Sequence, residues 1–160
     1  MSKLFAAALA FGATLALGCA AEAQRLPNLY GLPIGVADAR KAIAAAEAES
    51  VKNGWLMACA VVDPAGILVA YEKMDGTQNA AARIAIAKAR AAALFKRPTK
   101  ALEDVLAGGR MAILGLPGAV PVEGGLPILA QDQIVGAMGC SGGASAQDAQ
   151  VARAGLEAIK

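Results

Sequence analysis

The residues that could do chemistry in this chain gather in its last forty positions. A Gly-Gly-Leu-Pro-Ile turn at 124–128 leads through a strand to Gly-Cys-Ser-Gly-Gly at 139–143, and a helix that carries Asp148 follows. A strand that ends in glycines and opens a helix presents unpaired backbone N–H groups at the positive end of the helix dipole. This pattern predicts an anion pocket at the start of the last helix.

Asp148 itself has two interpretations. Ser145 and Asp148 have the spacing of a capping box, in which Ser145 caps a backbone N–H and the carboxylate reaches back to the cap residue. This interpretation is favoured over ligand contact, because a carboxylate at that helix start would repel a bound anion. The glycines of this region serve either a ligand or tight packing alone.

Asp63 and Lys88 are the other candidates for a site. Asp63 follows a strand and precedes Pro64, so an Asx-type turn is favoured over an acid–base role. Lys88 lies in the middle of an alanine-rich helix, near Arg83 and Arg90. We interpret it as part of a solvated helix face, with an ammonium group that reaches an anionic ligand as the alternative.

The chain has no histidine, which excludes Ser-His-Asp and Cys-His catalysis and argues against ordinary zinc and copper sites. Cys59 and Cys140 lie in predicted strands and form either a disulfide or two buried thiols. Heme iron also accepts thioether, thiolate or phenolate ligands. The candidates for such ligation are Met57, Met74, Met111, Met138, Tyr71, Cys59 and Cys140.

The first 23 residues are typical of a secretory signal. Lys3 precedes an apolar run at 4–17, and small residues lead to Ala23, after which we expect cleavage in preference to lipidation at Cys19. Residues 24–160 are then one exported domain, periplasmic or secreted, without a later stretch suited to span a membrane. A net charge of +2 without basic runs argues against nucleic acid as a partner.

The order of predicted elements favours an α+β domain with an antiparallel sheet. The hairpin strands are apolar on both faces, so we expect helices to cover one face of the sheet and a second subunit the other. The predicted helices are 36–53, 79–95, 99–106 and 146–159, and the predicted strands are 55–62, 67–71, a short one within 110–122, 127–130 and 133–140.

Several short motifs, in order along the chain, resemble the GlcG/HbpS-type heme-binding family, which is related to the corrinoid-associated PduO C-terminal-like domains. The motifs are VVDPAG at 61–66, MDG at 74–76, AKA at 87–89, RPT at 97–99, GGLPI at 124–128, VGA at 135–137, SG at 141–142 and QD at 147–148.

The resemblance implies a central antiparallel sheet of about five strands flanked by helices, assembled into dimers or larger oligomers. It also implies heme as the ligand, with a corrinoid as the alternative. Without histidine, weak or surface heme binding is the expected form. The ligand-binding positions that the resemblance carries over are Asp63, Lys88, Gly124, Gly125, Ser141, Gly142 and Asp148.

Two functions follow as hypotheses. The first is an exported, oligomeric tetrapyrrole-binding protein that anchors the heme propionates on Lys88 or on the glycine-rich helix start. The second is a small enzyme or accessory protein that acts on a small carboxylate or carbonyl compound in the same pocket. There Asp63 or Asp148 would be the acid or base. A third hypothesis is a structural or sensory partner protein without a working pocket.

Overall fold

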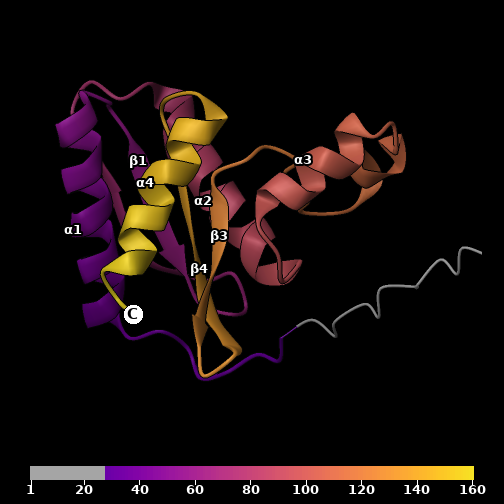
Figure 1. Ribbon diagram of the computed structural model, residues 1–160, viewed down its shortest axis with the longest axis horizontal. Coiled ribbons are helices and arrows are strands. Elements are labelled where there is room, and N and C mark those ends of the chain that lie inside the picture. The colour runs from indigo at the N-terminus through magenta and orange to yellow at the C-terminus, as the bar shows by residue number, and fades with distance from the viewer. Residues whose placement is uncertain (1–27) are drawn as a thin grey trace, which may run out of the picture.

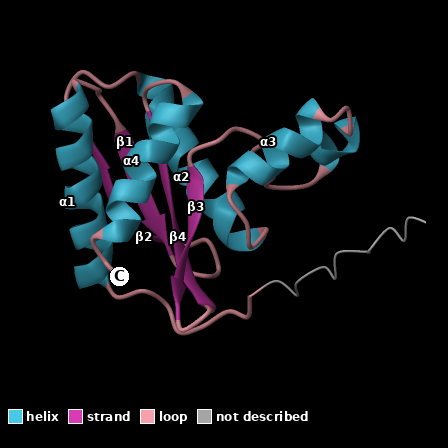
Figure 2. Cartoon of the chain, viewed as in Figure 1, coloured by secondary structure: helices cyan, strands magenta, loops and turns pink. Residues whose placement is uncertain are grey.

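The computed structural model describes residues 28–160, so the predicted signal segment and Cys19 lie outside the described residues. A four-stranded sheet lies between helices (Figures 1 and 2). Its elements are α1 (Val36–Asn53), β1 (Ala58–Val62), β2 (Leu68–Lys73), α2 (Asn79–Leu94), α3 (Thr99–Ala107), the 3₁₀ helix η1 (Met111–Gly115), β3 (Gly125–Ala130), β4 (Gln133–Ser141) and α4 (Ser145–Glu157). Within residues 28–160 no helix combines the length and apolar character needed to cross a bilayer.

The sheet is antiparallel throughout, with strand order β2-β1-β4-β3. The predicted α+β class is confirmed, but four strands are present where about five were expected. The missing strand is the short one predicted within 110–122, where the chain instead forms η1 followed by a turn. Gly115, Pro117 and Gly118 explain the difference, because proline cannot donate to a strand ladder and glycine weakens strands.

The chain covers both faces of its own sheet. Helices α1 and α4 pack on one face, where Ile43, Val61 and Val151 are part of one buried cluster (Figure 1). Helix α2 packs on the other face through a cluster made almost entirely of alanines. The expectation that a second subunit covers one face is therefore wrong, because α2 fills that place.

Two glycines let α2 lie directly on the sheet. A Cβ atom on Gly139 of β4 would overlap the backbone oxygen of Ala85, and one on Gly125 of β3 would overlap the backbone oxygen of Lys88. Since every other residue type carries a Cβ atom, only glycine permits this distance between helix and strand backbones. The α2 backbone can thus lie close to the sheet because Gly125 and Gly139 have no side chains.

A disulfide joins the two central strands. Cys59 of β1 and Cys140 of β4 are directly paired in the sheet register, with their Cα atoms 4.2 Å apart. The structure thereby decides between the disulfide and the two free thiols that the sequence left open.

We expect Gly139→Ala to lower the free energy of unfolding by about 1–3 kcal/mol, because the added methyl group forces α2 away from β4. Urea denaturation monitored by circular dichroism measures this loss. Gly115→Ala is the matched control, since nothing lies within 4 Å of a Cβ atom there. Equal stability of the two variants would contradict the close approach of α2.

Candidate functional site

Lys88 lies inside the protein, against the interpretation that it belongs to a solvated helix face. Its side chain projects from α2 and is 1% exposed, and its Nζ atom donates to Oδ2 of Asp148 at 2.7 Å. Asp148, on α4, is also buried. A charged group taken out of water is stabilised only when it is paired, so the two residues depend on each other.

The predicted capping box between Ser145 and Asp148 is wrong by one residue. Helix α4 begins at Ser145, so Ala144 occupies the cap position, and Gln147 accepts the Ala144 N–H through Oε1 at 2.9 Å. Asp148 is one residue further along and points inward. Its Oδ1 atom accepts the N–H of Gly143 at 3.0 Å.

The electrostatics of Asp148 combine two opposing effects. Burial raises the pKa of its carboxyl group above the ordinary value, and this effect is the largest. The hydrogen bond and charge of Lys88, together with the backbone N–H groups of Gly143 and Gly142, act to lower the pKa. The interactions with Lys88 and with the two backbone N–H groups thus oppose the effect of burial on this carboxyl group.

The glycines at 124 and 125 close around this ion pair. A Cβ atom on Gly124 would lie 2.8 Å from Nζ of Lys88 and 2.8 Å from Cβ of Asp148. Thr99, the first residue of α3, accepts the N–H of Gly125 through Oγ1 at 2.9 Å. Protein atoms thus lie close around the ion pair on the side of Gly124 and Gly125.

Ser141 and Gly142 lie at the same end of the sheet. Ser141 is buried and pairs with Ala58 of β1, and a Cβ atom on Gly142 would overlap the backbone oxygen of Leu56. Six of the seven predicted positions therefore meet in one packed cluster. Their ligand-binding role stays a prediction, and their observed contacts are structural.

Asp63 is the seventh predicted position, and the structure separates it from the other six. It follows β1 at the end opposite the Ala58–Ser141 pair. Its Oδ1 atom accepts the N–H groups of Ala65 and Ile67 at 2.9 and 2.8 Å. The predicted Asx-type turn is confirmed, and Asp63 lies at the opposite end of β1 from the cluster around Lys88.

A hollow suited to a ligand lies on the outer face of α2. We call it the α2 groove. Its volume is about 370 Å³. It is lined by Arg83, Ile86, Ala87, Arg90, Gly118 and Val120. A second hollow, lined by Asn79, Ala80, Arg83 and Ile84, extends the same helix face.

Sequence reasoning named Arg83 and Arg90 but did not assign them a site. The available signal was their spacing of seven residues, which places both on one helix face. The spacing could not reveal the opposite wall of the groove. That wall is formed by the loop residues Gly118 and Val120, about thirty positions further along the chain.

None of the predicted iron ligands is among the residues that line the α2 groove. Cys59 and Cys140 are joined in the disulfide, and Met138 is fully buried. Tyr71 lines a different hollow, beside Arg40. Within the described residues, no His, Cys, Met or Tyr side chain lines the α2 groove.

Comparison with known proteins identifies the family. Residues 34–157 match the family model described as haem degrading protein HbpS-like. The chain belongs to the HbpS-like family. Its relatives include the protein GlcG of Escherichia coli (strain K12), which is 45% identical over 99 residues that cover 62% of this chain and 74% of GlcG.

Solved structures of HbpS-like proteins have the same fold. A double mutant of Streptomyces reticuli HbpS superposes with a TM-score of 0.76 at 27% identity, over 97% of this chain and 99% of that chain. The crystal structure titled PduOC:Heme Complex gives a TM-score of 0.74 at 22% identity, over 81% of this chain and 96% of that chain. At that identity the second comparison shows the fold alone.

We expect Lys88→Met alone to lower the free energy of unfolding by about 3–5 kcal/mol, because it leaves the Asp148 carboxylate buried without its counter-ion. The double variant Lys88→Met/Asp148→Leu should recover most of that loss. Urea denaturation of the three proteins measures both effects. A single variant as stable as the parent protein would show that the ion pair is dispensable.

Proposed function

We propose that this protein binds heme in the α2 groove. The observation that carries the proposal is the pair of arginines, Arg83 and Arg90, which border an apolar floor formed by Ile86, Ala87 and Val120. Heme likewise combines charged groups with an apolar surface, because two propionates extend from one edge of an apolar ring. The family description names haem degradation, and binding is the step that such chemistry requires.

The two arginines are suited to the propionates. Seven residues of an α-helix rise about 10 Å, so the guanidinium groups stand on one face, two turns apart. Arginine recognises carboxylates through paired N–H donors, and these charge-assisted hydrogen bonds are stronger than neutral ones. Nε of Arg90 donates to the backbone oxygen of Gly66 at 3.0 Å, which holds that side chain in place.

The same chemistry favours heme over a corrinoid. Amidated corrinoids present neutral side chains where heme presents carboxylates, so the arginines would lose their charge-assisted partners. The volume of the groove, about 370 Å³, lies at the lower end of the range of ordinary ligand pockets. The residues that line it supply apolar contact and carboxylate recognition, without a side chain that ligates iron. Binding by these contacts alone fits the weak or surface mode expected from the absence of histidine.

We expect Arg83→Ala and Arg90→Ala each to weaken hemin binding roughly tenfold, because each removes one charge-assisted contact. Titration of the purified protein with hemin, followed in the Soret band, measures the affinity. Arg110→Ala is the matched control, because Arg110 is exposed and does not line the groove.

The companion measurement uses hemin dimethyl ester, which has no free propionate. It should bind the parent protein about as weakly as hemin binds the double variant Arg83→Ala/Arg90→Ala. Hemin affinity that is unchanged in this double variant would refute the α2 groove as the site. A spectrum of hemin that does not change on addition of the parent protein would refute heme binding itself.

We also propose that the protein is exported and forms a homo-oligomer. The signal-like pattern at 1–23 and the disulfide support export, since structural disulfides persist in oxidising compartments. Exposed apolar side chains on and after η1, among them Met111, Leu114 and Leu116, support assembly.

Native mass spectrometry of the protein purified from its host tests both proposals together. The subunit mass should correspond to a chain that starts at Gln24 with the disulfide formed, and the complex should be a whole multiple of it. A monomer that retains residues 1–23 would contradict both.

A further inference from the structure

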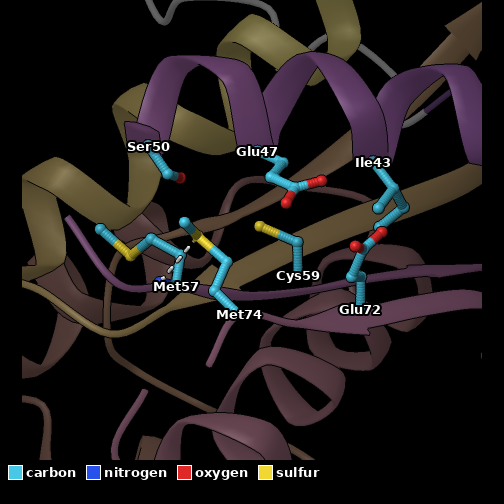
Figure 3. Close-up of a pocket in the computed structure, with 7 residues that line it drawn as sticks. All are labelled: Ile43, Glu47, Ser50, Met57, Cys59, Glu72 and Met74. Carbon is cyan, nitrogen blue, oxygen red and sulfur yellow. Dashed lines mark hydrogen bonds between the residues drawn. The ribbon is translucent and has the colours of Figure 1, made fainter. Parts of the chain in front are cut away.

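A small hollow lined by sulfur atoms lies under α1, on the face of the sheet opposite α2 (Figure 3). Met57, Met74 and Cys59 supply the sulfur atoms, and Glu47 and Glu72 bring carboxylates to the same space. Its cavity of about 10 Å³ admits about one water-sized sphere. A single ion can enter a space of this size, but a heme cannot.

Hydrogen bonds of the hairpin hold Met57 and Met74 beside each other. Met57 precedes β1 and Met74 follows β2, and the N–H of Met74 donates to the backbone oxygen of Met57 at 3.0 Å. The N–H of Met57 in turn donates to Sδ of Met74 at 3.4 Å, drawn as the dashed line in Figure 3. Thr77 Oγ1 also donates to the Met57 oxygen, at 3.1 Å. The sulfur atom of Met74 is therefore held against the Met57 backbone before any ligand arrives.

The charge around the hollow is negative. Glu47 on α1 and Glu72 on β2 line it, and neither takes part in an ion pair among residues 28–160. Arg40 shares a neighbouring hollow with Glu72 but forms no ion pair with it. Two carboxylates without a paired cation favour a positively charged occupant.

The donor atoms select the kind of cation. Thioether sulfur prefers soft ions such as Cu(I), whereas Zn²⁺ and Mg²⁺ prefer nitrogen, thiolate or oxygen ligands. Residues 28–160 contain no cluster of three or more His, Cys, Asp or Glu side chains that could hold a metal. A site for a harder divalent ion is thus not indicated here.

We propose that this hollow binds one soft monovalent cation of the Cu(I) type through the thioether groups of Met57 and Met74. The carboxylates of Glu47 and Glu72 supply negative charge around it. Cys59 forms part of the wall as one half of the disulfide, so the site needs no free thiolate. It differs from the histidine-based copper sites that the sequence argues against, and it is independent of the α2 groove.

The test uses the mature, disulfide-intact protein and Ag(I), a redox-stable substitute for Cu(I). With ¹³C-methyl-labelled methionine, the methyl resonances of Met57 and Met74 should shift on addition of one equivalent of Ag(I). Those of the exposed Met111 and the buried Met138 should stay in place. Zn²⁺ should shift none of them. Unmoved resonances of Met57 and Met74 would overturn the proposal.

Variants provide a second, quantitative arm. Met57→Leu and Met74→Leu nearly preserve side-chain volume, so the fold should persist while each weakens Ag(I) binding at least roughly tenfold. Met111→Leu is the matched control and should bind as the parent protein does. Competition against a chromophoric Ag(I) chelator measures the affinities. One-to-one binding that survives in the double variant Met57→Leu/Met74→Leu would also overturn the proposal, and a variant that fails to fold leaves the decision to the parent protein's methyl resonances.

Discussion

The close approach of α2 to the sheet is the constraint on which the rest of the structure depends. Gly125 and Gly139 place no side chain between the strands and the helix, and the helix contributes alanines to the same contact. Because the groups at this interface are so small, the backbone of the helix packs directly against the backbone of the strands. Any larger side chain on the same face of the helix is therefore buried as well. Lys88 is carried in this way, and its burial then requires a counter-ion, which Asp148 supplies from α4.

One helix thereby serves two purposes on its two sides. The inner side joins the sheet and holds Lys88, while the outer side presents Arg83 and Arg90 to solvent. The residues marked by the family resemblance belong mostly to the inner side, where they explain how the fold is held together. The side chains able to meet an anionic, apolar ligand lie on the outer side, which is shaped by the loop after η1.

The sheet also separates two sites of different chemistry. The α2 groove is large, apolar and bordered by guanidinium groups, whereas the hollow under α1 is the size of one ion and is lined by sulfur and carboxylate. The sheet lies between them, and the disulfide links its central strands β1 and β4. The two proposed sites thus lie on opposite faces of the sheet and differ in size and charge, since one is proposed for a carboxylate-bearing ring and the other for a soft cation.

The sequence by itself determined the features that depend on neighbouring residues. These are the first helix and its end at Gly54, the hairpin around the Asp63 turn, and the α+β class. Hydrogen bonds within a few positions and side-chain periodicity set such features. The burial of Lys88 and the pairing of Cys59 were decided by the tertiary structure, because their partners are 60 and 81 positions away. The pattern of Ala81, Ala85 and Ala89 marks a small-residue face that includes position 88, yet a sequence does not state what packs against it. Only the folded chain brings these distant partners together, and only the folded chain places Gly118 and Val120 beside α2 to form the wall of the α2 groove.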